Sequence, residues 1–239
     1  MPGKYPEHHI ARPVMLQRWA STAFIHWRLS PDELQPLLPS PLTPQVYDGT
    51  AWVSLVPLML SDFRPAVPFM RRGITFPEMN LRTYVVHPNG RAGLWFLTID
   101  AGNRPFSWAA RTFLGAPYYP ADVAVDHGDD TIRFTSRRSG ADSATCDVRL
   151  SMGEVIEKPD RLALNDSLAG QWRAFTKRVG VLFDVSIEHE PWPLRHAELL
   201  SFDERYFELV GLQRPTGPPL VQFADAVNVR MALPMPARA

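Results

Sequence analysis

The strictest alternation of polar and apolar residues in the chain runs from Glu78 to Val85. Glu78, Asn80, Arg82 and Tyr84 share one parity, while apolar residues and one threonine take the other up to position 85. A period of two predicts a β-strand whose successive side chains point to opposite faces. An acid, an amide, a guanidinium and a phenol in one row could line an internal pocket. A surface strand gives the same alternation with its polar row in water, so both interpretations remain open.

Other segments of this kind predict a mainly β protein with some short helices. We expect strands at 22–29, 51–60, 78–86, 93–100, 122–127, 131–138, 146–154, 181–188 and 220–231. Asn89-Gly90 lies between two of these strands and predicts a tight hairpin, which would fix the register of the Glu78 strand. Residues 1–18 are expected to form an irregular lead-in, and residues 61–73 a loop.

Three further helices are expected after a short one that begins near residue 31. Ser30 and Glu33 have the spacing of a capping box. In this motif each of the two side chains accepts a hydrogen bond from the backbone N–H group of the other residue. Helical patterns also predict helices at 105–114, 164–179 and 202–209. The 24 prolines are spread along the whole chain and argue against longer helices. The fold class expected is therefore β-rich α+β, arranged as a barrel with a few short helices.

Composition narrows the class of protein. With 239 residues and no internal repeat or linker, we expect a single domain over residues 1–239. A formal net charge of zero leaves no basic stripe for nucleic acid. No apolar run approaches the roughly 18 residues that a membrane helix needs, and the first residues lack the apolar core of a signal peptide. The single cysteine, Cys146, suits a reducing compartment. We expect a soluble cytoplasmic protein.

Lysine is scarce in this sequence. Lys4, Lys158 and Lys177 stand against 22 arginines. Chemistry that needs a lysine amine therefore has few places in the chain.

Several motifs, taken in order, resemble the acetoacetate decarboxylase superfamily over nearly the whole chain. They are the leucine- and proline-rich stretch at 34–42, Phe76-Pro77-Glu78 and the stretch from Ala110-Arg111 to Tyr118-Tyr119. A closer resemblance is to a branch of that superfamily classed as a domain of unknown function. It rests on residues 78–85, Gly93-Leu94-Trp95-Phe96, Ala110-Arg111, Pro117-Tyr118 and Pro191-Trp192-Pro193-Leu194. The resemblance implies a cone-shaped β-barrel that encloses a cavity for a small molecule.

The resemblance also implies where the chemistry would lie and where it departs from the decarboxylase. Glu78 matches a cavity glutamate that assists proton chemistry, and Arg111 matches an arginine ahead of the active segment. The decarboxylase then has two lysines, of which the first forms a Schiff base. Tyr118 and Tyr119 stand at those positions here. A phenol cannot form an imine with a ketone, so we expect that this protein is not a Schiff-base decarboxylase.

Glu78 and Tyr118 are the candidate catalytic residues. Burial would raise the pKa of Glu78 toward neutrality and fit it for general acid–base work. The alternative is a Glu78 carboxylate that is simply paired with Arg82. Tyr118 takes the place of the imine-forming lysine and could steady negative charge on a carbonyl oxygen, or it could simply pack.

Five residues are candidates for binding a substrate. Arg82 and Arg111 could each hold a carboxylate with two hydrogen bonds, although Arg111 could equally be a residue near a helix end. Asn80, Tyr84 and Tyr119 could donate hydrogen bonds into an apolar pocket. The expected ligand is a small organic molecule that bears a carboxylate or a carbonyl group.

No cofactor or metal is expected. His189-Glu190 begins a zinc-like pattern, but Pro191 and Pro193 forbid the helix that such a site needs. The leading hypothesis is an internal pocket with cofactor-free lyase-, isomerase- or hydratase-like chemistry. A binding protein without turnover and a purely structural role are the alternatives, and the sequence leaves open whether the chain forms a homo-oligomer.

Overall fold

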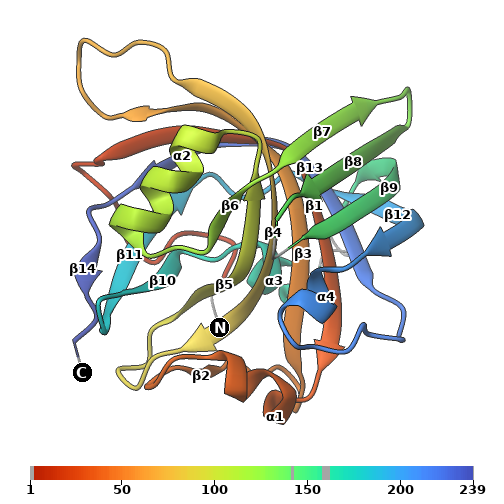
Figure 1. Ribbon diagram of the computed structural model, residues 1–239, viewed down its shortest axis with the longest axis horizontal. Coiled ribbons are helices and arrows are strands. Elements are labelled where there is room, and N and C mark those ends of the chain that lie inside the picture. The colour runs from red at the N-terminus through yellow and green to blue at the C-terminus, as the bar shows by residue number, and fades with distance from the viewer. Residues whose placement is uncertain (1–2, 141–142, 158–161, 239) are drawn as a thin grey trace.

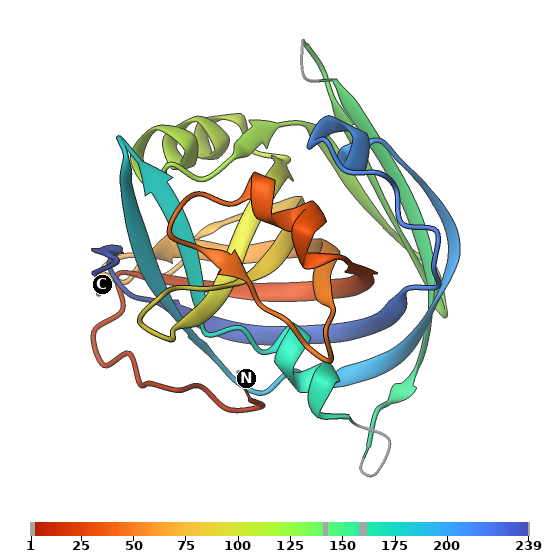
Figure 2. The ribbon, with the colours of Figure 1, turned by 90° about the horizontal axis from the view of Figure 1, so that it is seen from below.

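The computed structural model describes residues 3–140, 143–157 and 162–238. Among these residues, seven strands pair side by side in a complete ring (Figures 1 and 2). In ring order the strands are β1 (Met15–Leu29), β3 (Ala51–Pro65), β4 (Ile74–Val86), β5 (Ala92–Ala101), β10 (Arg173–Arg178), β11 (Val181–His189) and β13 (Leu220–Met231). Within this ring the β5–β10 pair is parallel and the others are antiparallel. The predicted mainly β fold is confirmed.

A second layer continues the sheet beyond the ring. It runs from β13 through β12 (Leu194–Glu204) and β9 (Ala144–Val155) to β8 (Thr131–Arg138) and β7 (Asp122–His127). In Figure 2 these strands form a separate wall at the right of the ring. Three short strands complete the sheet: β2 (Thr43–Pro44) pairs with β4, β6 (Tyr118–Pro120) with β5, and β14 (Met235–Pro236) with β11.

Helices occupy the connections. They are α1 (Pro31–Leu34) with a 3-10 turn at Gln35–Leu37, α2 (Arg104–Ala109) with a π-helical turn at Ala110–Leu114, α3 (Ala163–Ala169) and α4 (Tyr206–Leu209). The predicted capping box is present: the Ser30 hydroxyl accepts a hydrogen bond from the backbone of Asp32, and Glu33 accepts one from the backbone of Ser30. Figure 2 shows α1 lying across one mouth of the ring. No helix among the described residues is long and apolar enough to cross a membrane.

The central parts of β1, β3 and β4 are buried on both faces because both faces are covered. Inside the ring, an inner core includes Phe24, Val56 and Leu168. Outside it, side chains of β1, β3 and β4 pack against β8 and β9, with Met79 and Phe134 both fully buried. A strand buried on both faces cannot be oriented from its alternation alone.

Some predicted elements differ from the structure. The helix expected at 164–179 is wrong beyond Ala169, because residues 173–178 instead form β10 between β5 and β11. The helix expected at 202–209 is present over Tyr206–Leu209, while residues 202–204 instead continue β12. The expected loop at 61–73 is shorter, since β3 runs to Pro65, and β1 begins inside the expected lead-in at Met15.

Candidate functional site

The polar row of β4 points into the ring. Glu78, Asn80, Arg82 and Tyr84 are each at most 5% exposed, and Tyr84 belongs to the inner core. Their apolar neighbours of opposite parity, such as Met79, face the outer core. The Asn89-Gly90 turn joins β4 to β5 as predicted, with Gly90 at a φ of +83° that favours glycine. Of the two interpretations of the alternation, the inward one is correct.

Glu78 lies at one end of the row and accepts two hydrogen bonds. The hydroxyl of Tyr118 donates to Oε2 at 2.9 Å, and the amide of Asn80 donates to Oε1 at 3.0 Å. Burial raises the pKa of Glu78 to about 7, against the opposing effects of these two donors and of the charge of Arg82. A carboxyl group with a pKa near neutrality can both take up and release a proton at physiological pH.

Tyr118 reaches Glu78 from a different part of the chain. Pro117 and Pro120 keep this segment extended, and β6 pairs in parallel with β5 so that Tyr118 lies beside Ile99. The Tyr118 ring packs edge-on against Phe106 of α2 at 5.1 Å. Burial and the neighbouring Glu78 carboxylate raise the pKa of Tyr118 well above its usual value, so its phenol stays a hydrogen-bond donor.

Arg82 is buried, and no acidic side chain of the described residues forms an ion pair with it. Among the described residues, its Nε and Nη2 atoms have no hydrogen-bond partner, and it forms no ion pair with Glu78. Its guanidinium lies over the ring of Phe24 at 5.7 Å. Burial lowers the pKa of Arg82, while Tyr84 and Glu78 oppose that change. Because buried N–H groups without acceptors are costly, the protein holds here a donor pair suited to an anionic group.

Three side chains that share hydrogen bonds lie at the Tyr84 end of the row. The Tyr84 hydroxyl is 2.7 Å from the Ser54 hydroxyl and 3.1 Å from Nδ1 of His26, and Ser54 is 2.5 Å from the same nitrogen. Burial, followed by the charge of Arg82, lowers the pKa of His26 to about 3, so its imidazole is neutral. His26 and Ser54 were not predicted as site residues. The β1–β3 register makes His26 and Ser54 direct partners. The sequence signal that could have found them is their position on the inward-facing side of two strands, but it needs that register to be recognised.

Tyr119 and Arg111 do not join this cluster. Tyr119 lines a groove outside the ring, where its ring stacks against the guanidinium groups of Arg138 at 3.8 Å and Arg111 at 4.5 Å. Successive residues of an extended strand point to opposite faces, so the side chains of Tyr118 and Tyr119 lie on opposite sides of β6. The predicted binding roles of Tyr119 and Arg111 stay predictions, at a separate place from Glu78.

The lysines lie elsewhere. Lys177 is exposed on β10 rather than on the expected helix, Lys4 lies in the lead-in, and Lys158 falls outside the described residues. Cys146 is buried, and burial raises the pKa of its thiol well above the usual value. Within the described ranges, no group of three or more His, Cys, Asp or Glu side chains could hold a metal ion.

Solved structures with a similar fold include acetoacetate decarboxylase-like proteins. An acetoacetate decarboxylase-like enzyme from Sphingomonas wittichii RW1 matches with a TM-score of 0.65 at 12% identity, over 97% of this chain and 96% of that one. The enduracididine biosynthesis enzyme MppR, solved with pyruvate, matches with a TM-score of 0.64 at 12% identity, over 99% and 98% of the two chains. At such identities the likeness concerns the fold.

The sequence itself places the chain in a family. The DUF2071 model, described as an uncharacterized conserved protein, matches residues 16–228. The chain is also 30% identical over 237 residues to the "Uncharacterized protein YqjF" of Bacillus subtilis (strain 168), which covers 96% of both chains. This protein therefore belongs to the DUF2071 family, within the acetoacetate decarboxylase-like fold.

Proposed function

We propose that the ring interior binds a small carbonyl or carboxylate compound and that Glu78 moves a proton to or from it without a cofactor. One observation carries the proposal: a buried glutamate, with a pKa of about 7, is hydrogen-bonded by a tyrosine that stays protonated. The reaction class would be lyase-, isomerase- or hydratase-like. Fold neighbours offer support, since MppR is an enzyme solved with pyruvate.

Arg82 would hold the anionic end of the ligand. Its Nε and Nη2 donors lie on the same strand face as Glu78, four residues along, and have no hydrogen-bond partner among the described residues. A carboxylate that accepts from both N–H groups would satisfy them in the bidentate geometry that arginine favours. The ligand would then extend along β4 from Arg82 toward Glu78.

Glu78 and Tyr118 would act at the other end. An ionised Glu78 would take the proton from a carbon beside a carbonyl group, leaving an enolate. Tyr118 and Asn80, which both donate to Glu78 in the free protein, are the donors available for the enolate oxygen. Return of the proton to a different atom would give isomerisation, and loss of a neighbouring leaving group would give elimination.

A Schiff-base route has no support from the site. Tyr118 occupies the place at which the decarboxylase resemblance puts the imine-forming lysine. Lys177 lies on the outer side of the ring, and within the described residues the side chains that donate hydrogen bonds to Glu78 are those of Asn80 and Tyr118 rather than a lysine. A binding protein without turnover is the second candidate. An ion pair between Glu78 and Arg82 would favour it, but the geometry does not provide that pair.

The test combines binding with proton exchange. Small keto acids, hydroxy acids and lactones are screened for thermal stabilisation of wild type, Arg82→Met, Glu78→Gln and the surface control Arg205→Met. A ligand at 100 times its Kd stabilises the folded state by about 2.7 kcal/mol. We expect a compound that stabilises wild type, Glu78→Gln and Arg205→Met, but not Arg82→Met.

That compound is then incubated in D2O, and exchange at the carbon beside its carbonyl is followed by NMR. Loss of a general base lowers such rates by about 100- to 10,000-fold, so Glu78→Gln should abolish measurable exchange. Binding without exchange or turnover in wild type would establish the non-catalytic binder. If no compound distinguishes wild type from Arg82→Met, the interior site is wrong.

A further inference from the structure

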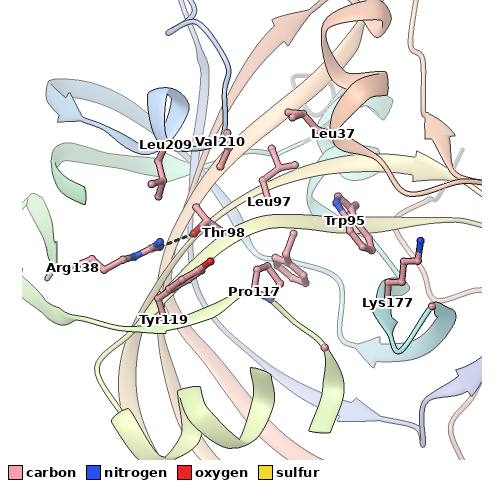
Figure 3. Close-up of a pocket in the computed structure, with 13 residues that line it drawn as sticks. Leu37, Trp95, Leu97, Thr98, Pro117, Tyr119, Arg138, Lys177, Leu209 and Val210 are labelled. Atoms are coloured by element: carbon pink, nitrogen blue, oxygen red, sulfur yellow. Dashed lines mark hydrogen bonds between the residues drawn. The ribbon is translucent and has the colours of Figure 1, made fainter. Parts of the chain in front are cut away.

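A groove of about 530 Å³ lies on the outer side of β5 (Figure 3). Its walls are mostly apolar and come from β5, α4, the turn after α1 and the segment before β6; they include Leu37, Trp95, Leu97, Leu209 and Val210. The volume falls in the range of about 300–1,000 Å³ that is typical of small-molecule sites. None of the inward polar residues of β4 is among its lining residues within the described chain.

The groove exists because β5 is irregular at its middle. Arg82 pairs with Phe96 and Leu81 pairs with Thr98, so Leu97 is an extra residue that forms a β-bulge. The other edge of β5 pairs with β10 at residues 94–95 and with β6 at residues 99–101. Residues 96–98 thus have a strand partner on the β4 side alone, and the groove opens at this interruption.

Gly115 keeps one wall of the groove close to β10. It has a φ of +69°, and a Cβ atom built on it would lie 2.4 Å from the carbonyl oxygen of Lys177. Only glycine fits that approach. The backbones of the two chain segments that flank the groove are therefore in close contact at this point.

The charged residues that line the groove are both cations. Arg138 is buried and fixed: its Nε donates to the carboxylate of Asp100 at 2.6 Å, its Nη2 donates to the hydroxyl of Thr98 at 2.6 Å, and Tyr119 stacks on its guanidinium. Figure 3 shows Arg138 and Lys177 on opposite sides of the apolar wall. Asp100 compensates the charge of Arg138, whereas exposed Lys177 has no ion-pair partner among the described residues.

We propose that this groove is a second binding site, for an amphipathic anion: a carboxylate or sulfonate carried on an aliphatic or aromatic body. The leucine, valine and tryptophan wall would take the apolar body, because removal of apolar surface from water is favourable. Lys177 would take the anionic group, and no acidic side chain of the lining opposes it. Arg111, whose guanidinium also lies over the Tyr119 ring, adds a further positive charge at the margin. This site is independent of the chemistry proposed for Glu78.

The probe is octanoate, with octanol as its uncharged counterpart, titrated by calorimetry. Octanoate should bind wild type with one site. Lys177→Met should weaken octanoate binding about two- to fivefold, the range expected for one exposed ion pair, and should leave octanol binding unchanged. Lys4→Met is the matched control and should bind octanoate like wild type. Val210→Asp places a carboxylate in the groove and should weaken octanoate binding by at least about tenfold.

Arg82→Met separates the two sites. It should bind octanoate like wild type, because Arg82 does not line the groove. Circular dichroism establishes that each variant is folded before titration. The proposal is overturned if octanoate does not bind, if Lys177→Met and Val210→Asp bind it like wild type, or if Arg82→Met loses it. The last result would place octanoate inside the ring.

Discussion

Replacing Glu78 by glutamine should change how the stability of the protein depends on pH. The two side chains have the same shape, and the amide cannot ionise. Burial raises the pKa of Glu78 from 4.5 to about 7. A shift of one pKa unit corresponds to about 1.4 kcal/mol, so the shift amounts to about 3 kcal/mol between the protonated and ionised states.

The direction in which stability changes with pH follows from proton binding. Between pH 4.5 and 7 the folded protein keeps the Glu78 proton and the unfolded chain does not. The free energy of unfolding therefore falls by about 1.4 kcal/mol for each pH unit as pH rises through this window. The contribution of Glu78 is fully present below pH 4.5, and it is lost above about pH 7.

Two histidines act in the opposite direction. Burial lowers the pKa of His26 to about 3 and that of His189 to about 4, so the unfolded chain takes up their protons first as pH falls below 6.5. Their contributions to stability rise with pH up to about 6.5. The wild-type curve alone mixes the three effects, but the difference between wild type and Glu78→Gln isolates the glutamate.

Urea unfolding of both proteins at half-unit steps from pH 4.5 to 8 measures that difference. Relative to wild type, Glu78→Gln should gain about 3 kcal/mol between pH 4.5 and 7 and change little beyond. Circular dichroism and tryptophan fluorescence should give the same midpoints, as two-state unfolding requires. If the two stability curves run parallel, the pKa of Glu78 is ordinary, and the argument for a buried proton carrier fails.

Three further substitutions test the hydrogen-bond assignments by urea unfolding at pH 7, and wild-type stability in any of them would contradict the corresponding contact. Tyr84→Phe should lower the free energy of unfolding by about 1–3 kcal/mol, because it leaves two buried polar partners without their shared hydroxyl. Arg138→Met should cost about 3–5 kcal/mol, since the carboxylate of Asp100 stays buried without its cation. Ser30→Ala should cost about 1 kcal/mol through loss of the helix cap.

The sequence predicted which side chains of β4 share a face, but it could not say which way that face points. Both parities of the strand are buried, because the layer formed by β8 and β9 covers the side away from the ring. The row of four polar residues was therefore equally compatible with solvent. The direction of this face is set by the pairing that completes the ring, between β11 and β13, whose paired residues are some 40 positions apart.

The sequence could not predict site residues whose neighbours come from distant strands. His26 and Ser54 become partners through the β1–β3 register, which no local pattern states. The same limit explains the overlong helix prediction after Ala163: Phe175 fits helical spacing, but its strand is set by pairing with Trp95 of β5. Local signals with local consequences, such as the capping box at Ser30, were read correctly.

The bulge at Leu97 makes β5 two half-strands of opposite phase. Before it, even-numbered residues such as Phe96 face the ring; after it, Ile99 and Ala101 do, and Asp100 turns outward. If the same residues paired with β4 without the bulge, the half-strand after Leu97 would turn over and bring the carboxylate of Asp100 to the inner face, beside the polar row of β4. The bulge thus keeps the two sets of charged groups on opposite faces of the sheet.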